Sequence, residues 1–244
     1  MLADIWTVMA KELREIFVAG GYGKRGLIGL LTFIGIFGVL IPLMDGREWV
    51  ESPMNIPSMS LLAFVIVPRM VADSFAGERE RHTLETLLAS RLSDLGIVLG
   101  KIGAAIAYGC GLTWLVVCVG WLTVNIAYGS SGLLFISPMA FIGIVGFTIL
   151  ICGAVASAGV LVSLRSPTVR DAQQTFSLFW FLIFISIIAS PFLPPKWTAP
   201  ITRWLLLASS EQKMLAAAGI LIVLNIIFIT ITILRFRRSR LLLD

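Results

Sequence analysis

Charged residues are scarce in this sequence. Asp, Glu, Lys and Arg make up 14% of the 244 residues, whereas 58% are hydrophobic. The mean hydropathy of +0.95 is too high for a water-soluble domain of this size, so we expect lipid to be the solvent. The net charge of +5 could suggest nucleic acid, but the basic residues lie in short tracts between long apolar segments. That distribution indicates anionic headgroups and membrane topology, and it argues against a nucleic-acid partner.

Residues that usually carry chemistry are also few. The cysteines Cys110, Cys118 and Cys152 lie in apolar segments without CxxC spacing, and the one histidine, His82, is not near them. We interpret the cysteines as packing residues and predict no metal site. A lipid-embedded hydrolase would need a nucleophile with a base, or paired acids, at membrane depth. Asp73 is the one clear acid near the interior of an apolar segment, so we predict no catalytic residue.

A phosphate-binding loop is missing as well. ATP hydrolysis would require a glycine-rich loop that ends in Gly-Lys-Ser or Gly-Lys-Thr. The closest runs are GYGKR at residues 21–25 and GKI at residues 100–102, and neither has the hydroxyl or the preceding glycine spacing. We therefore expect this chain to bind no cofactor, and any ATP hydrolysis to belong to another polypeptide.

Long apolar runs occupy most of the chain. About 20 apolar residues in a helix cross the roughly 30 Å of hydrocarbon in a bilayer. Six segments approach or exceed that length, so we predict an all-α membrane protein with six transmembrane helices. The predicted spans are about 27–44, 58–76, 97–127, 138–164, 173–193 and 213–234.

Basic residues predict the orientation of these spans. Of the 19 Lys and Arg residues, 14 lie on one side: before the first span, between the second and third, after the fourth and after the sixth. By the positive-inside rule we expect both termini to be cytoplasmic. The cytoplasmic set is Lys11, Arg14, Lys24, Arg25, Arg79, Arg81, Arg91, Lys101, Arg165, Arg170, Arg235, Arg237, Arg238 and Arg240.

The N-terminal residues 2–17 have the spacing of a helix with an apolar side and a charged side. Leu2, Trp6 and Leu13 lie on one side of that helix, with Lys11 and Arg14 on the other. We predict that residues 1–24 form an interfacial helix on the membrane. A helix that packs on a partner is the alternative. No basic region precedes an apolar core, so we expect the segment to be retained and not cleaved as a signal peptide.

Residues 77–94, GERERHTLETLLASRLSD, place a dense charge cluster between two spans. The leucines that follow it, Leu84, Leu87, Leu88 and Leu92, have the spacing of one helix face, and Thr83 is a plausible N-cap. Such a helix could lie with its leucines in the groove of a partner. Alternatively, the segment is a solvated loop whose leucines rest on the membrane.

The run VPRMVADSFAGERERHTLETLLASRLSDLGIVLGK, residues 67–101, resembles the signature of type 2 ATP-binding-cassette (ABC) exporter permeases. In that family a Glu-rich turn, a Thr-Leu-Glu step, a Leu-Leu pair and a Gly-Lys follow the second span. The resemblance implies that residues 77–94 are the coupling segment, which docks on a separate ATP-binding subunit. It also implies that ATP and Mg are bound by that partner, and that the Pro-rich segment 191–210 forms a short outer gate.

Position by position, the resemblance assigns contacts with the ATPase subunit to Glu78, Glu80, Thr83, Leu84, Glu85, Leu87 and Leu88. Two residues depart from the family pattern. His82 stands where glycine is usual, and Arg69 is an unexpected charge within the second span.

Arg69 would be costly in lipid, by about 3 kcal/mol on insertion scales. Asp73 follows one turn later and is a natural partner, so we predict an intramembrane Arg69–Asp73 pair near the subunit interface or the substrate route. Snorkelling of Arg69 to the interface is the alternative.

Together these features predict one transmembrane permease domain over residues 1–244, in the cell membrane. It would pair with a second copy or a similar permease and bind two cytoplasmic ATPase subunits. The alternative is a self-sufficient channel or secondary transporter, for which the polar span residues Arg69, Asp73, Asn125 and Asn225 would be candidates. No pattern distinguishes drugs, lipids, sodium ions or peptides as the substrate.

Overall fold

The computed structural model describes residues 1–16, 24–52, 55–129, 132–189, 192 and 194–236. Throughout these residues every regular element is a helix. Parts of several predictions lie outside them: residues 17–23 of the predicted interfacial segment, residues 190, 191 and 193 of the predicted fifth span and outer gate, and Arg237, Arg238 and Arg240 of the last basic tract. The prediction of an all-α protein is confirmed.

Five helical segments are long and apolar enough to cross a membrane, and they coincide with five of the predicted spans. They are Gly26–Asp45, Ser58–Glu80, Asp94–Tyr128, Pro138–Ser163 and Ser210–Arg235. The remaining predicted span, 173–193, coincides with α10 (Val169–Ala189) and then continues into residues that are only partly described. The count of six therefore stays a prediction.

The first span is not a uniform α-helix. It consists of α2 (Lys24–Ile34), a π-helical stretch η2 (Gly35–Leu40) and α3 (Ile41–Asp45), and short helices α4 (Glu48–Glu51) and α5 (Asn55–Ser60) follow. The second span continues through α6 (Ala63–Glu80) to the short helix α7 (Leu84–Leu88). The third, fourth and last spans are α8 (Asp94–Tyr128), α9 (Pro138–Ser163) and α12 (Ser210–Arg235).

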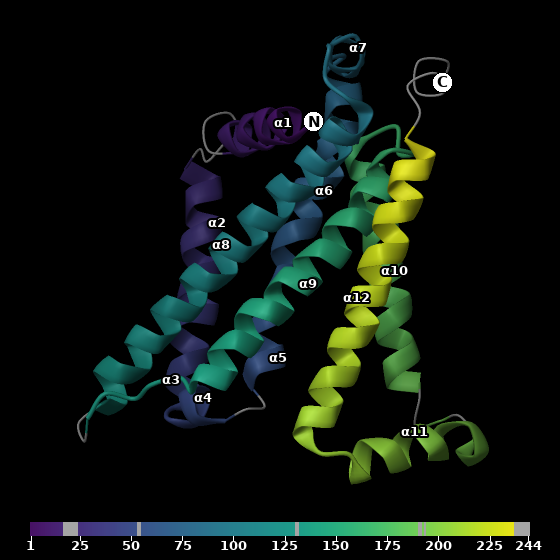
Figure 1. Cartoon of the computed structure of the whole chain (residues 1–244). Coiled ribbons are helices and arrows are strands. Elements are labelled where there is room, and N and C mark those ends of the chain that lie inside the picture. Colours follow the sequence, from purple (N-terminus) through teal and green to yellow (C-terminus); the bar gives the residue numbers. More distant parts are fainter. Residues whose placement is uncertain (17–23, 53–54, 130–131, 190–191, 193, 237–244) are drawn as a thin grey trace.

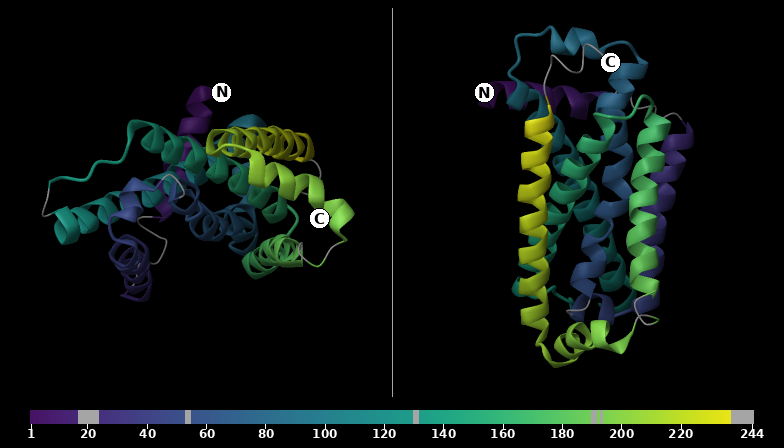
Figure 2. Two further views of the ribbon diagram at one scale, coloured as in Figure 1. Left: turned by 90° about the horizontal axis from the view of Figure 1, so that it is seen from below. Right: turned by 90° about the vertical axis from the view of Figure 1, so that its right-hand side faces the viewer.

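The long helices run side by side, and two short helices lie across their ends (Figures 1 and 2). Helix α1 (Leu2–Arg14) lies across one end, and α11 (Pro195–Leu207) lies across the other. The N-terminus, α7 and the last turn of α12 share the end where α1 lies. We refer to it as the α7 end.

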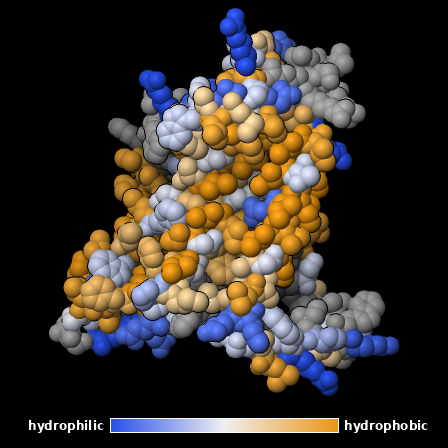
Figure 3. Space-filling model, in the orientation of Figure 1, coloured by the Kyte–Doolittle hydropathy of each residue, from blue (hydrophilic) through white to orange (hydrophobic). Residues whose placement is uncertain are grey.

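The surface of the bundle is apolar between its two ends. On the face in Figure 3, hydrophobic residues form a broad band, with hydrophilic residues gathered at both ends. Large apolar side chains of the long helices are exposed, including Leu31, Ile142 and Ile226 at 59–67%. A soluble monomer rarely exposes such a contiguous surface, so the arrangement is that of a multi-pass membrane protein.

Three of the long helices begin at a serine whose side chain caps the first turn. Ser93 accepts a hydrogen bond from the amide of Gly96 at 3.2 Å, and Ser137 accepts one from Ala140 at 3.1 Å. Ser209 forms a capping box with Gln212 at the start of α12. These caps satisfy amides that the helix itself cannot, and so they define where α8, α9 and α12 begin.

The core of the bundle lies where α6, α8 and α9 meet. A Cβ atom at Gly109 of α8 would lie 2.5 Å from Cγ2 of Val67 on α6 and 2.8 Å from Sγ of Cys152 on α9. Glycine at this position therefore allows three backbones to approach closely, as small residues do between membrane helices. The spans on either side of this core, α2 to α3 and α12, are mostly exposed.

Asn225 joins two spans, and Asn125 holds the connection between α8 and α9 against α8. Asn225 of α12 donates a hydrogen bond to the carbonyl of Leu150 on α9 at 2.9 Å. Asn125 of α8 donates to the carbonyl of Leu134 at 3.1 Å and accepts from its amide at 2.7 Å. Both asparagines thus make packing bonds, which removes them as evidence for a channel or carrier site.

Helix α1 packs closely on the first turns of α8. A Cβ atom at Gly96 would lie 2.6 Å from Cβ of Asp4, and one at Gly100 would lie 2.6 Å from Cβ of Val8. On the other side of α1, Leu2 and Trp6 are exposed at 79% and 67%. The prediction of a helix with one apolar exposed side agrees with this, whereas its placement on a membrane stays a prediction.

Candidate functional site

Residues 77–94 connect the second and third spans and form the outermost part of the α7 end. Helix α7 projects beyond α1 in both views (Figures 1 and 2). The segment is anchored at its two ends by long helices, because it begins in α6 and leads into α8. A force on α7 would therefore act directly on two spans.

The helix in this segment is shorter than the leucine spacing predicts. It covers only Leu84–Leu88, and Leu92 lies outside it, directly before Ser93, the N-cap of α8. Leu84 and Leu88 are 6% and 4% exposed and belong to the same core as Phe75 and Ile97, and Leu87 and Leu92 pack partly against it. The leucines thus pack against this chain itself and not in a groove of a partner.

Some of the residues that the resemblance assigns to ATPase contact are exposed, and others are buried within this chain. Glu80, Thr83 and Glu85 are exposed, and Leu87 is half-buried. By contrast, Glu78, Leu84 and Leu88 are buried within this chain, so their side chains cannot touch another subunit in this conformation. The outward face of α7 is therefore polar, and it also includes Thr86.

The backbone explains why glycine suits position 82. His82 has a φ of +54°, in the left-handed region that a side chain with a Cβ atom rarely adopts. Histidine is one of the residues that tolerates this region better than most. The departure from the family pattern therefore keeps the sharp turn between α6 and α7.

Four charged residues meet beneath the segment. Nζ of Lys101 on α8 lies 2.7 Å from Oε1 of Glu12 on α1 and 3.1 Å from Oε1 of Glu78 on α6. Nζ of Lys11 lies 2.8 Å from the same Glu78 oxygen. We call Lys11, Glu12, Glu78 and Lys101 the charge cluster. Its formal charges cancel, and it joins three helices.

The charge cluster is buried where Lys101 and Glu78 lie. The Lys101 side chain is 1% exposed, and its ammonium group also donates to the carbonyl of Ser74 at 2.7 Å. The ring of Phe75 lies 4.9 Å from Nζ of Lys101, a distance suited to a cation–π contact. Paired and hydrogen-bonded in this way, the buried ammonium group avoids the large cost of an isolated charge.

Lys11 occupies the solvent side of the cluster. Burial by itself would lower the pKa of Lys11, but the hydrogen bond to Glu78 and the charges of Glu78, Glu12 and Glu15 raise it overall. Lys11 therefore remains protonated across the physiological range, and the ion pair with Glu78 persists.

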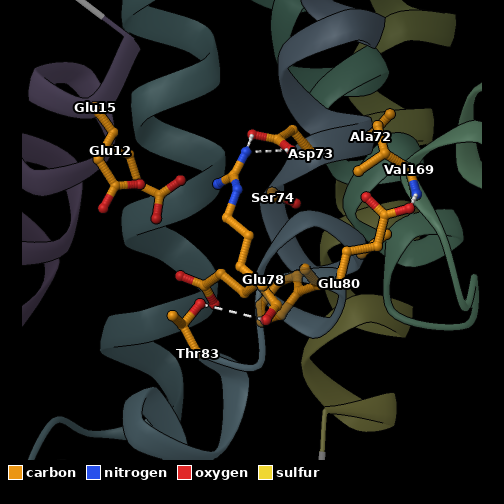
Figure 4. Close-up of polar contacts among 12 residues, drawn as sticks. Glu12, Glu15, Ala72, Asp73, Ser74, Glu78, Glu80, Thr83 and Val169 are labelled. Carbon is orange, nitrogen blue, oxygen red and sulfur yellow. Dashed lines mark hydrogen bonds and ion pairs between the residues drawn. The ribbon is translucent and has the colours of Figure 1, made fainter. Parts of the chain in front are cut away.

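Asp73 has a different partner from the one predicted. Nη2 of Arg81 lies 2.9 Å from both carboxylate oxygens of Asp73, whereas Arg69 is exposed and makes no ion pair among the described residues. The expected Arg69–Asp73 pair is thus replaced, because the turn after α6 brings Arg81 back over the last turns of that helix. Figure 4 shows Asp73 above Glu78 along α6.

On the side away from α1, the segment is tied to the turn between α9 and α10. The guanidinium group of Arg79 donates to the carbonyls of Leu164 and Ser166, just beyond the end of α9, where a helix leaves its last carbonyls without partners of its own. The carboxylate of Glu80 accepts a hydrogen bond from the amide of Val169 at 3.3 Å. In Figure 4 Glu80 and Val169 lie on one side of the segment, and Glu12 and Glu15 lie on the other.

Sequence reasoning missed the charge cluster. The signal was present, because Lys101 lies inside an apolar span that was predicted to begin at about residue 97. A lysine at that depth requires a partner. Its acidic partners come from residues 12 and 78, which are too distant in the sequence for any local pattern to connect.

A comparison with models of protein families identifies the family of this chain. The family model described as "ABC-2 family transporter protein" matches residues 53–236, which is more than half of the chain. A comparison with curated proteins finds no match. The matched range includes α7 and the described residues from α5 to α12, and it leaves α1 outside.

Proposed function

Because this chain belongs to the ABC-2 transporter family and is a transmembrane permease component of an ABC transporter, we propose that it forms the translocation path of an ATP-driven exporter. In this proposal it spans the cell membrane six times, with both termini in the cytoplasm. Two copies, or this chain and a similar permease, would bind two ATPase subunits. The outward direction is proposed from the resemblance of residues 67–101 to exporter permeases.

The observation that carries the proposal is the position of α7. It lies at the outermost point of the bundle, with an exposed polar face and an anchored apolar one. Its neighbours in the segment are bonded to α1, α8 and the α9–α10 turn. Movement of a docked subunit would therefore be transmitted to several helices at once, since packed helices shift between discrete arrangements.

The length of α10 supports a sixth span. Its 21 residues rise by about 31 Å; the first six, VRDAQQ, are mostly polar and suit the membrane interface, and the remaining 15 are mostly apolar. An even number of spans also agrees with the presence of α1 and the end of α12 at the same end of the bundle. We further propose that α11, across the opposite end, belongs to the outer gate.

We propose that docking uses the polar face of α7, with Glu80, Thr83, Glu85 and Thr86. Glu78, Leu84 and Leu88 would act indirectly, by holding that face in place. Arg81 and Arg91 are exposed in the same segment as Glu80 and Glu85, so this surface has charges of both signs and favours a partner surface with complementary charges and hydrogen-bonding groups. This differs from the groove-bound leucine helix that the spacing predicts.

Co-purification tests the proposal. The tagged chain is expressed in its native host, extracted in mild detergent and purified, and the ATP hydrolysis rate per mole of chain is measured. Glu85→Lys should lower the retained hydrolysis at least fivefold, because it reverses a charge on the docking face. Glu211→Lys is the matched control, since Glu211 is also an exposed acid in the first turn of a helix but lies at the start of α12.

Equal hydrolysis in the two variants would contradict docking through α7. Absence of any ATP-binding subunit from the unmodified preparation would contradict the transporter assembly itself.

A further inference from the structure

The attachment of α1 to α8 is made at two places along α1. At its first turn, the Asp4 carboxylate accepts hydrogen bonds from the hydroxyl and the amide of Ser93, at 2.7 and 3.2 Å. At its last turns, Glu12 binds Lys101 at 2.7 Å. Asp4 and Glu12 are eight residues apart, which is about 12 Å along a helix. Two bonds at this separation prevent α1 from pivoting on α8.

Between those two attachments the helices are in direct contact. Gly96 and Gly100 leave no room for a Cβ atom between α8 and α1, and Val8 of α1 is 1% exposed. Such contact leaves neither helix free to slide, because packed interfaces have no space for small displacements. Along this stretch α1 and α8 behave as one body.

The charge cluster extends this body to the docking segment. Glu78 is the last buried residue of α6 before α7, and its Oε1 atom is shared by Lys101 of α8 and Lys11 of α1. The amide of Thr83, directly before α7, donates to the carbonyl of Glu78 at 2.9 Å. In addition to the packing of Leu84 and Leu88 in the core, the position of α7 is therefore linked through Glu78 to a lysine on α8 and a lysine on α1.

We propose that α1, the ends of α6 and α8, and α7 move as a single rigid unit in the transport cycle, with Lys101 as the positioning residue that holds the unit together. This inference rests on the proposed function, because it concerns motion driven by the ATPase subunits. It assigns α1, which lies outside the family match, a part in transmission beyond that of a membrane anchor.

A disulfide between α1 and α8 tests whether they move together. Asp4→Cys and Ser93→Cys place two thiols where the native side chains are 2.7 Å apart, in a background with the three native cysteines replaced by alanine. The assembled complex is oxidised or reduced, and ATP turnover is measured in nanodiscs. A rigid unit predicts turnover within twofold in the two states. A tenfold drop on oxidation, reversed by dithiothreitol, would mean that the helices must separate and would overturn the proposal.

The same disulfide tests the role of Lys101. In the reduced state, Lys101→Met should lower ATP turnover at least fivefold relative to the disulfide-pair chain, because Glu12 and Glu78 lose their shared cation. Oxidation should restore turnover to within twofold, since the disulfide replaces the attachment of α1 to α8 and Lys11 of α1 still pairs with Glu78 of α6. Lys213→Met, near the start of α12 at the opposite end, is the control and should change nothing.

If Lys101→Met does not lower ATP turnover, or if oxidation does not restore the lowered turnover, Lys101 does not act through α1. Because a disulfide by itself stabilises a fold, the thermal unfolding midpoint is measured in both redox states. Restored turnover in a chain whose Lys101→Met midpoint already lies well above the assay temperature supports positioning, whereas a reduced Lys101→Met chain that is unfolded at the assay temperature would overturn it.

Hydrogen exchange of the isolated full chain in nanodiscs keeps this test independent of the ATPase. Lys101→Met should raise exchange at least tenfold in residues 2–14 and 84–88 together, and the oxidised disulfide should reverse the change in both. A rise confined to one of the two segments would overturn the rigid unit. If the exchange result is as expected but the turnover results are not, the rigid unit stands and the proposed function is wrong.

Discussion

A few buried charged residues at the α7 end are important for the stability of the fold. Lys101 and Glu78 are charged and almost fully buried, and each is held by partners from other helices. Removing one member of such a group leaves an unpaired buried charge, which destabilises a protein by about 3–5 kcal/mol. Residues like these are therefore the first to examine when a variant of this chain assembles poorly.

Gly100 should tolerate no side chain. In Gly100→Ala the new Cβ atom would lie 2.6 Å from Cβ of Val8 and 3.0 Å from the carbonyl oxygen of Ile5, so α1 must move away from α8. We expect a loss of about 1–3 kcal/mol, seen as a lower thermal unfolding midpoint in detergent. Gly111→Ala is the control, because nothing lies within 4 Å of that Cβ position. Equal midpoints for the two variants would contradict the close contact.

Asp4 should make the attachment of α1 sensitive to acid. Hydrogen bonds from the Ser93 side chain and then its backbone lower the pKa of Asp4 below its ordinary value of 3.8. A depressed carboxyl pKa stabilises the fold above the unfolded value, and this stabilisation is lost as the pH falls through the folded value. The unfolding midpoints of wild type and Asp4→Asn should therefore differ by a constant amount above pH 5 and converge below about pH 3.8. A constant difference down to pH 3 would exclude this role for the carboxylate.

At the scale of elements, α7 is a short turn of helix whose apolar face belongs to the bundle core. Leu84 and Leu88 connect it to α6 and α8 through the largest core cluster. Its exposed face is consequently small and polar, and its position depends on the helices beneath it. Stability and docking should therefore respond to different substitutions within the same few residues.

Leu88→Ala should destabilise the fold by about 2–5 kcal/mol, because it leaves a cavity at a side chain that is 4% exposed. Glu85→Lys, three residues earlier and exposed, should change stability by less than about 0.5 kcal/mol while it weakens ATPase retention. Denaturant unfolding of the purified chain separates the two effects. A stable Leu88→Ala chain that fails to bind the ATPase would mean that this leucine faces the partner after all.

At the scale of the whole molecule, the distribution of charge predicts how the bundle is inserted. Fourteen of the 19 basic residues lie on the side of the predicted topology that contains the α7 end. Basic residues near the ends of spans remain in the cytoplasm during insertion. The docking face and the expected ATPase would then be in the same compartment.

Labelling of introduced cysteines checks this orientation. Thr86→Cys on α7 and Thr202→Cys on α11 are exposed and lie at opposite ends of the bundle. With a thiol reagent that does not cross membranes, Thr202→Cys should be labelled in intact cells, and Thr86→Cys only after permeabilisation. The reverse pattern would contradict a cytoplasmic α7 end and, with it, docking of an ATPase there.

The sequence by itself determined the class of this protein, its apolar helices and most of their boundaries. These are local properties, because a run of about 20 apolar residues requires a helix in lipid. The serine caps at Ser93 and Ser209, which begin α8 and α12 three residues before the predicted spans, were found only in the structure. The motif at residues 67–101 pointed to the family that the comparison then found. None of these inferences needed residues that are distant in the chain.

Only the tertiary structure decided how the α7 end is assembled. Asp73 had two arginines within reach, and the turn at His82 selected Arg81 over Arg69. The leucines of residues 84–92 could have faced a partner, but in the structure they pack in or against the core of α6 and α8. Lys101 pairs with Glu12, which is 89 residues away in the sequence. Contacts of this kind depend on which helices pack together, and no local pattern of residues contains that information.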